Sequence, residues 1–278
     1  EILKSRSRIL QHLATQGLTD EHYAVVSAMV LGDKSSLTNE VKNLYSVTGA
    51  SHVLALSGLH LGIIYTLLSL LVVRRRWHTV SQFLIVLSIW AFVFLTGMSG
   101  SLIRSAVMLS LYALLSLGHR DKLSVNTLAF TAIVMLMANP LSLYDVGFQL
   151  SFMAVFAILL WLPLFDEVFS WEYLQSHRLA KWVWALVSVS CAAQIGVAPL
   201  IAYYFGHFST FFLPTNFIVV PAATLILYLS LIGLLVPSFT YILLYVVGIL
   251  HSVLRYIASV PGSSMGPLHP TLLQVMMV

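Results

Sequence analysis

The stretch SHVLALSGLHLGIIYTLLSLLVV, residues 51–73, has the apolarity and the length of a membrane-spanning helix. Its positions 53–73 contain no formally charged side chain. At about 1.5 Å per residue such a helix measures roughly 32 Å, which is enough to cross a hydrocarbon core of about 30 Å. A simple anchor has no use for Ser57 and His60, which lie inside the stretch. We therefore expect a spanning helix with a second role.

The composition extends this interpretation to the whole chain. Of its 278 residues, 59% are hydrophobic and only 9% are charged, and the mean hydropathy is +0.92. A soluble domain of this size carries roughly a quarter charged residues. The sequence therefore predicts an all-α polytopic membrane protein. A formal net charge of +4 fits nucleic-acid contact and fits basic residues at membrane edges equally well. The single cysteine, Cys191, cannot form an internal disulfide.

The apolar segments predict about eight transmembrane or partly re-entrant helices. Their expected bounds are about 53–73, 79–97, 103–118, 123–138, 147–164, 182–203, 211–235 and 238–259. The third and the fourth are short for a full crossing. Basic residues gather in alternate connections, namely Arg74, Arg75, Arg76, Arg120, Lys122, Arg178 and Lys181. The positive-inside rule places these connections in the cytoplasm and both termini outside it.

Residues 1–50 differ from the rest because charged and apolar positions are mixed there along helical stretches. These stretches are too polar to span a membrane, so we expect amphipathic helices at the extracytoplasmic interface. A solvated helical linker fits the pattern equally well. We divide the chain into this segment, a transmembrane domain at 51–262 and a C-terminal linker at 263–278 toward a further domain. Because the sequence begins at Glu1 and shows no cleavable signal pattern, we expect a piece of a longer protein.

The motif SGLHLG in the opening stretch combines small and polar residues. Gly58 and Gly62 form a GxxxG pair, which lets a second helix approach closely. Ser57 and His60 lie on nearby faces of the helix, and His52 precedes it. The motif indicates either close helix packing or the lining of a wet cavity, and a histidine within a span favours the lining role.

A second motif, LTGMSGSLIRSAVM at residues 95–108, places Arg104 in an apolar stretch. Its small and polar residues include Gly97, Gly100, Ser101 and Ser105. The glycines break the helix, and a charge near the bilayer centre costs at least about 2.5 kcal/mol. The arginine therefore either extends to the outer edge of the membrane or lies in a polar cavity where it meets an anion.

The third motif, ANPLSLYDVGFQLSFMAVF at residues 138–156, begins with a turn at Asn139–Pro140. Asp145 stands near the start of a helix, where a carboxylate accepts hydrogen bonds from free N–H groups. We therefore interpret Asp145 as a helix cap rather than a catalyst. Gln149 then enters the next span.

The fourth region, residues 191–225, carries polar and helix-breaking residues in two neighbouring spans. They are Gln194, Gly196, Pro199, Pro214, Asn216 and Pro221. Prolines in adjacent spans favour broken helices that line a polar path, and simple kinks are the alternative. Aromatic residues cluster between the spans, at Tyr203, Tyr204, Phe205, Phe208, Phe211 and Phe212. An interfacial aromatic belt explains most of them, and a base-stacking rim requires a similar set.

Several classes of site lack their sequence signature. The chain has no P-loop, no HExxH and no CxxC, so we expect no metal, no cofactor and no bound ATP. No carboxylate within a span marks a proton-coupled transporter. Ser57 and His60 form a conceivable hydrolase dyad, although one helical turn rarely gives the required geometry.

Four motifs in this order resemble the ComEC family, the DNA-internalisation channels of naturally competent bacteria. The matching segments are residues 32–62, 95–108, 138–152 and 193–209. The resemblance implies the competence domain, which passes one strand of DNA across the inner membrane during natural transformation. It also implies an external OB-like domain before this segment and, in many members, a metallo-β-lactamase-like nuclease domain after it. An external DNA receptor and cytoplasmic helicase or single-strand-binding proteins are the implied partners, beside single-stranded DNA and the lipid bilayer.

The resemblance and the residues together give two candidate sets, and we expect no catalytic residue in this segment. Candidates for lining the channel or contacting DNA are His52, Ser57, His60, Ser101, Arg104, Ser105, Gln149, Gln194 and Asn216. Candidates for packing or breaking helices are Gly58, Gly62, Gly97, Gly100, Pro140, Gly196, Pro199, Pro214 and Pro221. A secondary transporter or lipid-linked glycan handler, and an intramembrane serine hydrolase, are the alternative functions.

Overall fold

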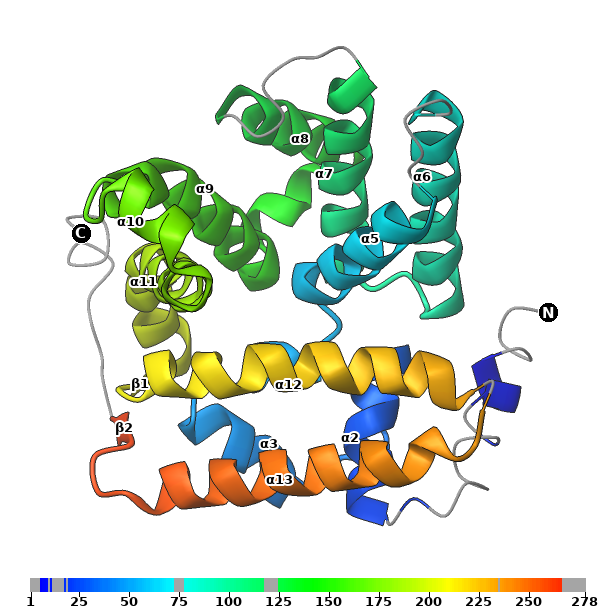
Figure 1. Cartoon of the computed structure of the whole chain (residues 1–278), viewed down its shortest axis with the longest axis vertical. Coiled ribbons are helices and arrows are strands. Elements are labelled where there is room, and N and C mark those ends of the chain that lie inside the picture. Colours follow the sequence, from blue (N-terminus) through cyan, green and yellow to red (C-terminus); the bar gives the residue numbers. More distant parts are fainter. Residues whose placement is uncertain are drawn as a thin grey trace.

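The structure, a computed structural model, describes residues 6–9, 11, 18, 20–72, 78–117, 125–234 and 236–266 (Figure 1). Its helices are α2 (Asp20–Leu31), α3 (Asn39–Val47), α4 (Ser51–Leu54), α5 (Gly58–Val72), α6 (His78–Leu95), α7 (Gly100–Leu117), α8 (Val125–Ala138), η2 (Pro140–Tyr144), α9 (Val146–Asp166), α10 (Trp171–Ser176), α11 (Arg178–Phe205), α12 (Phe212–Gly233) and α13 (Phe239–Ser259). The strands are β1 (Phe208–Ser209) and β2 (Ser264–Met265), which pair antiparallel. The predicted all-α membrane fold is confirmed.

Each predicted span corresponds to an apolar helix. Four of these helices, α9, α11, α12 and α13, are long and apolar enough to cross a membrane. The other four, α5 to α8, are apolar but shorter. The predicted short third and fourth spans agree with α7 and α8, whereas α5 and α6 are shorter than the full crossings predicted at 53–73 and 79–97.

The opening stretch differs from its prediction because it is not one continuous helix. Helix α4 ends at Leu54, Ala55 is extended with φ −94° and ψ 131°, and α5 begins at Gly58. A helix of 15 residues measures about 22 Å, which is less than a hydrocarbon core. At this break the N–H of Ser57, which α5 leaves without a helical partner, donates a hydrogen bond to the side chain of His60.

The helices form two groups that meet along α12 (Figure 1). Helices α12 and α13 lie side by side, with α2 and α3 packed against them. Helices α5, α6 and α7 pack together in the other group, and α9 pairs with α11 along much of its length. Helices α8 and α9 are joined by the short helix η2, and α7 contacts α9 across this connection. The α7–α9 contact brings the second and third motifs together.

Helix α2 lies inside the main hydrophobic core, so it lacks the exposed polar face predicted for the helices of residues 1–50, whose place at the membrane interface stays a prediction. Residues 24–31 are all buried and share this core with residues of α4, α5, α12 and α13. The sequence AVVSAMVL is apolar on every face, and such a helix is stable only when it is surrounded by protein or lipid. The described part of residues 1–50 is thus continuous with the rest of the fold.

The residues after α13 also differ in part from the predicted linker. Strand β2 pairs with β1, and the carbonyl oxygen of Ser263 accepts a hydrogen bond from the N–H of Thr210 at 3.2 Å. Residues 263–266 are therefore attached to the end of α11 through this short sheet. The remainder of the predicted linker, 267–278, lies outside the described residues.

The prolines predicted to break helices do so less than expected. Helix α11 continues through Pro199 and α12 continues through Pro221, while Pro214 lies in the first turn of α12. A proline lacks its own N–H and its ring crowds the carbonyl four residues before it, but the remaining backbone groups of an apolar helix have no water to replace their partners. Pro140 begins η2 after Asn139, whose side chain accepts a hydrogen bond from Leu141, so the predicted turn is confirmed.

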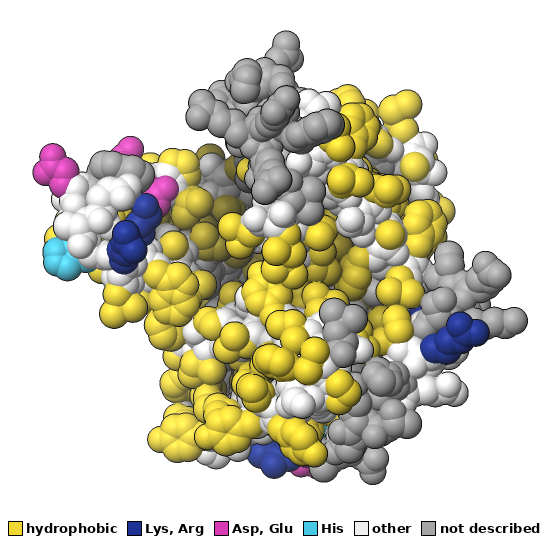
Figure 2. Space-filling model, turned by 45° about the vertical axis from the view of Figure 1, so that its right-hand side comes forward, with side chains coloured by type: hydrophobic (Ala, Val, Ile, Leu, Met, Phe, Trp, Pro, Cys, Tyr) yellow, Lys and Arg dark blue, Asp and Glu magenta, His cyan; other side chains and the backbone are white. Residues whose placement is uncertain are grey.

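The surface agrees with a membrane environment. Figure 2 shows hydrophobic side chains over most of one face, with charged side chains in small groups at its edges. Soluble monomers rarely expose apolar areas of this extent. Two of the basic connections used for the predicted orientation, which contain Arg74 and Arg120, lie outside the described residues. The orientation of the termini stays a prediction.

Candidate functional site

A polar junction forms where α5, α7 and α9 begin. We use this term for Ser57, His60, Arg104, Ser105, Asp145 and Gln149, which the fold brings to three neighbouring helix N-termini. Backbone N–H groups at these termini add positive potential to the basic side chain there. The junction collects residues from three of the sequence motifs.

Arg104 and Asp145 form the electrostatic centre of the junction. Their Nη1 and Oδ1 atoms lie 3.3 Å apart, and the exposed fractions of the two side chains are 9% and 58%. The guanidinium is therefore buried beneath a carboxylate that faces outward. Its Nε has no hydrogen-bond partner among the described residues. Arg104 is thus buried and meets an anion, the carboxylate of Asp145, which is nearer to the second of the two arrangements expected from the sequence.

Glycines make room for the guanidinium. A Cβ atom at Gly147 would lie 3.0 Å from Nη2 of Arg104 and 3.1 Å from Oδ1 of Asp145. A Cβ at Gly100 would lie 3.6 Å from Nη1. The absence of a side chain at Gly147 therefore lets the guanidinium lie against the first turn of α9, whereas a Cβ at Gly100 would make an ordinary contact.

Asp145 has a second partner in its own helix. Its Oδ1 accepts a hydrogen bond from the N–H of Phe148 at 2.6 Å, which confirms the predicted cap of α9. One oxygen atom is thus shared between the helix cap and the arginine. The cap bond is the shorter of the two, so the carboxylate is fixed mainly by α9.

His60 is fully buried and supports the start of α5. Its Nδ1 accepts a hydrogen bond from the N–H of Ser57 at 3.3 Å and lies 3.3 Å from the Ser57 hydroxyl. A backbone N–H can only donate, so the neutral ring carries its proton on Nε2. That atom has no partner among the described residues. The arrangement resembles a capping box, in which the third helical residue bonds back to the N-cap.

The two glycines of SGLHLG have different environments. A Cβ at Gly58 would lie 2.8 Å from Oγ of Ser105, so this glycine allows α5 and α7 to approach closely. A Cβ at Gly62 would have no atom within 4 Å. The GxxxG interpretation is therefore correct for Gly58 and wrong for Gly62, because only the first glycine faces the neighbouring helix.

The fourth motif reaches the junction through Gln149. Its Nε2 donates to the carbonyl oxygen of Leu143 at 2.9 Å, and its Oε1 accepts from the hydroxyl of Tyr204 at 2.6 Å. A Cβ at Gly196 would lie 2.5 Å from the Cβ of Ala157, so α9 and α11 are in close contact along this pair. Gln149 thereby links the start of α9 to the end of α11.

Other predicted site residues lie apart from the junction or take no direct part in it. His52 is exposed and its Nδ1 lies 3.1 Å from the carbonyl oxygen of Gly49. Gln194 is half-buried within α11, and Asn216 in α12 has a buried Oδ1 without a partner among the described residues. Ser101 contributes its carbonyl oxygen to the hydroxyl of Ser105. The predicted lining set is thus only partly assembled.

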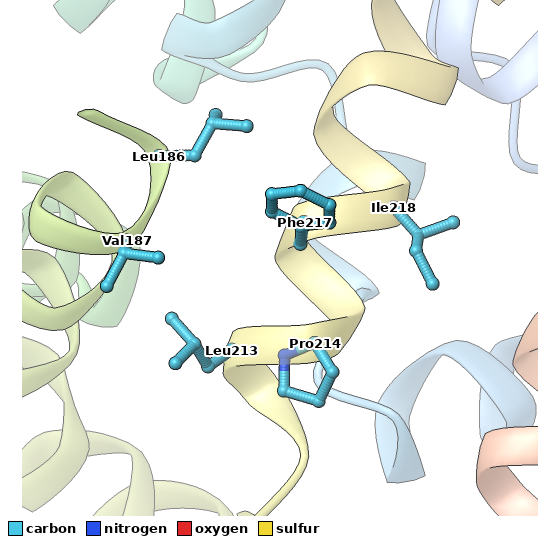
Figure 3. A pocket seen from close by; sticks show the side chains of 6 residues that line it. All are labelled: Leu186, Val187, Leu213, Pro214, Phe217 and Ile218. Carbon is cyan, nitrogen blue, oxygen red and sulfur yellow. The ribbon is translucent and has the colours of Figure 1, made fainter. Parts of the chain in front are cut away.

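A separate groove of about 360 Å³ lies between α11 and α12 (Figure 3). Its lining is entirely apolar and consists of Leu186, Val187, Leu213, Pro214, Phe217 and Ile218. Only Pro214 belongs to either predicted set. This groove therefore has none of the chemistry expected of a polar path. Within the described residues, no group of three or more His, Cys, Asp or Glu side chains is placed to hold a metal ion.

Comparison with known proteins identifies the family. A family model described as "Competence protein" matches residues 29–278, which is most of the chain. The chain belongs to the Competence protein family. The resemblance inferred from the four motifs is thereby confirmed.

Three relatives illustrate the relationship. The chain is 31% identical to "ComE operon protein 3" of Bacillus subtilis over 81% of its own length and 27% of the relative. It is 32% identical to an "Uncharacterized protein" of Aquifex aeolicus over 78% of its own length and 48% of the relative. It is 22% identical to "Recombination protein 2" of Haemophilus influenzae over 77% of its own length and 28% of the relative. The chain thus spans about a quarter to a half of these members of the Competence protein family. No solved structure matches it.

In this member of the Competence protein family, sequence reasoning missed the pairing of Arg104 with Asp145. A signal was present, because both are lone charges at the starts of spans on the same predicted side of the membrane. Isolated charges at such a depth usually pair with one another. The role of Tyr204 as a partner of Gln149 carried no comparable signal.

Proposed function

We propose that the chain forms the membrane passage for one strand of DNA during natural transformation. The observation that carries the proposal is the buried, charged junction at Arg104 within a largely apolar helical protein of the Competence protein family. A buried arginine is costly and is usually retained for a specific anion or ion path. The phosphate backbone of DNA supplies such an anion at every nucleotide.

The chemistry of the junction fits movement better than tight binding. An apolar path would exclude phosphates because their charge would lose its hydration. A path with many free Lys and Arg side chains would hold the strand too strongly for it to leave. The junction offers one partly neutralised arginine, amide and hydroxyl groups, and helix N-termini, whose contacts with phosphate are individually weak.

Exposed aromatic rings near the junction can supply contacts to the bases. Tyr144 immediately precedes Asp145, and Tyr203 and Tyr204 end α11 beside Gln149. All three side chains are exposed. Stacking of a base on an aromatic ring is worth about 1–3 kcal/mol and does not depend on the base sequence. This arrangement supports passage of any DNA sequence.

The rest of the functional assignment follows from this proposal. The passage lies in the bacterial inner membrane with both termini outside the cytoplasm, and the segment itself has no catalytic role. An external DNA receptor delivers the strand, and cytoplasmic helicase or single-strand-binding proteins draw it inward. Flanking OB-like and nuclease-like domains would belong to the same protein.

Alanine replacement tests the passage. We expect Arg104→Ala and Gln149→Ala in the full-length protein to reduce transformation by at least about tenfold at equal protein level, because each removes a polar contact of the junction. The control is Gln175→Ala, which removes an exposed side chain on α10. Normal transformation by well-expressed junction variants would contradict the proposal.

One observation favours a second candidate function, an intramembrane serine hydrolase. The hydroxyl of Ser57 lies 3.3 Å from Nδ1 of His60, close to the reach of a nucleophile and its base. A triad would further require an orienting group on Nε2, which has no partner among the described residues. Labelling of Ser57 by a fluorophosphonate probe would favour the hydrolase, and transformation by Ser57→Ala would favour the passage.

A further inference from the structure

We propose that Arg104 binds phosphate and that the carboxylate of Asp145 occupies the phosphate position when no DNA is bound. We call this pair a latch, because a passing phosphodiester would displace Asp145 from Arg104. The identity of the anion rests on the proposed function. The latch itself is argued from the contacts of these two residues.

The guanidinium of Arg104 has fewer hydrogen-bond acceptors around it than it has N–H donors. A guanidinium has five N–H donors, and a carboxylate that matches it well accepts two of them at about 2.7–2.9 Å. Here a single contact of 3.3 Å joins Nη1 to Oδ1, and Nε has no partner among the described residues. The geometry leaves donors that a second oxyanion can use.

Asp145 can yield the arginine without leaving its own helix. Its Oδ1 is held by the N–H of Phe148 at 2.6 Å, which is the stronger of its two contacts by distance. The carboxylate is more than half exposed, whereas the guanidinium below it is almost completely buried. An anion arriving from outside therefore meets Asp145 first and reaches Arg104 by displacing one long contact.

The guanidinium lies against the backbone of Gly147 and near that of Gly100. Each places only backbone where a Cβ would contact the guanidinium. Ser105 lies next in the chain, but its hydroxyl donates to Ser101 and does not compete for Arg104. A phosphate oxygen would thus reach the arginine from the side that Asp145 covers, by displacing its carboxylate.

Exchange of one anion for another explains why the site would not trap DNA. A buried arginine without a counter-charge is strongly unfavourable, so one anion must always be present. When a phosphate leaves, Asp145 takes its place and the charge remains compensated. The guanidinium is never without an anion. Each phosphate is therefore bound only as strongly as its free energy of interaction with Arg104 exceeds that of the Asp145 carboxylate.

The first test is binding of a fluorescent 20-nucleotide oligothymidylate to the full-length protein in lipid nanodiscs. We expect Asp145→Asn, which keeps a good helix cap but removes the competing charge, to lower Kd about five- to tenfold. A methylphosphonate oligomer, which lacks backbone charge, should show no such gain. The matched control is Glu172→Gln, the same charge change on the exposed surface of α10. Equal effects of the two variants would overturn the latch.

A double variant assigns the effect to Arg104. In the Arg104→Gln background we expect Asp145→Asn to have no effect on Kd, and persistence of its gain would overturn the proposal. If Arg104→Gln does not assemble, Arg104→Lys keeps the charge but loses the planar fork. The gain from Asp145→Asn should then fall by more than half, and an undiminished gain would also overturn the proposal.

Inorganic pyrophosphate separates this inference from the proposed function. A ligand that binds the folded state raises its melting temperature. We expect pyrophosphate to raise the melting temperature of Asp145→Asn more than that of Glu172→Gln. This shift without oligonucleotide binding would refute the DNA passage but keep the anion site. Oligonucleotide binding that is equal in all variants, without the shift, would refute the latch but keep the passage.

Discussion

At the scale of single residues, the fold contains buried polar groups that local interactions only partly satisfy. Tyr45 is fully buried in α3, and its hydroxyl has no hydrogen-bond partner among the described residues. Its ring meets that of His251 edge to face, with centroids 5.9 Å apart. Burial raises the pKa of Tyr45 well above its ordinary value, and the nearby carboxylate of Glu21 raises it further.

Tyr45→Phe should stabilise the protein by about 1 kcal/mol, because a buried hydroxyl without a partner costs about 1–3 kcal/mol. The raised pKa also has a consequence at high pH. The folded state retains the proton that the unfolded state loses above its ordinary pKa of about 10, so stability is full below this pH and declines above it. We expect the decline to be smaller in Tyr45→Phe.

Thermal unfolding in detergent micelles between pH 9 and 11 measures both effects. Tyr241→Phe, at a position that is 79% exposed, is the control and should leave both the stability and its pH dependence unchanged. A loss of stability in Tyr45→Phe, or an alkaline decline as steep as that of the parent protein, would contradict this account.

Two substitutions at His60 distinguish a role in capping α5 from a role in DNA transport. Gln at the third helical position can accept the same backbone hydrogen bond, so His60→Gln should retain stability, whereas His60→Leu should lose about 0.5–2 kcal/mol. If the imidazole lines the passage, both variants should lower transformation at equal protein level. Normal transformation by His60→Gln would assign the residue to the start of α5 alone.

At the scale of helices, close approach depends on particular glycines. Helices α9 and α11 form an extended pair, and Gly196 lies on the face of α11 that packs against α9. A Cβ at this position would also lie 2.8 Å from the carbonyl oxygen of Met153, which cannot move independently of α9. By contrast, Gly62 in α5 faces open space.

Gly196→Ala should therefore destabilise the protein by about 1–3 kcal/mol, because the added methyl group forces the two helices apart. Gly62→Ala is the matched control. It should be neutral or stabilising by up to about 1 kcal/mol, since alanine is the better helix former and meets no neighbour. Thermal unfolding of both variants in micelles gives the comparison, and equal effects would show that the α9–α11 contact is looser than described.

At the scale of the whole molecule, the arrangement of the connections makes the orientation testable. Leu141 in η2 is 73% exposed and belongs to a connection predicted to lie outside the cytoplasm. Gln175 in α10 is exposed in a connection predicted to lie inside it. The two positions are suited to labelling because Cys191 is the only cysteine among these 278 residues.

In a Cys191→Ala background, we expect Leu141→Cys to react with a membrane-impermeant maleimide in intact spheroplasts. Gln175→Cys should react only after permeabilisation, because the basic residues Arg178 and Lys181 keep its connection in the cytoplasm. Cys191→Ala alone gives the background signal. The reverse pattern of labelling would place both termini inside the cell.

The sequence by itself determined the features that depend on neighbouring residues. Long apolar runs without charge require helices, since backbone polar groups in lipid have no other partner. The turn at Asn139–Pro140 and the cap at Asp145 likewise follow from hydrogen bonds within a few positions. The break before α5 is also local but was missed, because its capping bond comes from a histidine rather than from a standard acidic or amide residue.

Only the tertiary structure decided which distant residues meet. Arg104 pairs with Asp145 across 41 positions, Gln149 with Tyr204 across 55, and Glu21 with Arg255 across 234. It also decided that α2 lies in the core and that only one glycine of the GxxxG pair faces another helix. Periodicity shows which face of a helix is polar, but the partner on that face depends on how all the helices pack. No local pattern in the sequence specifies these contacts between distant residues.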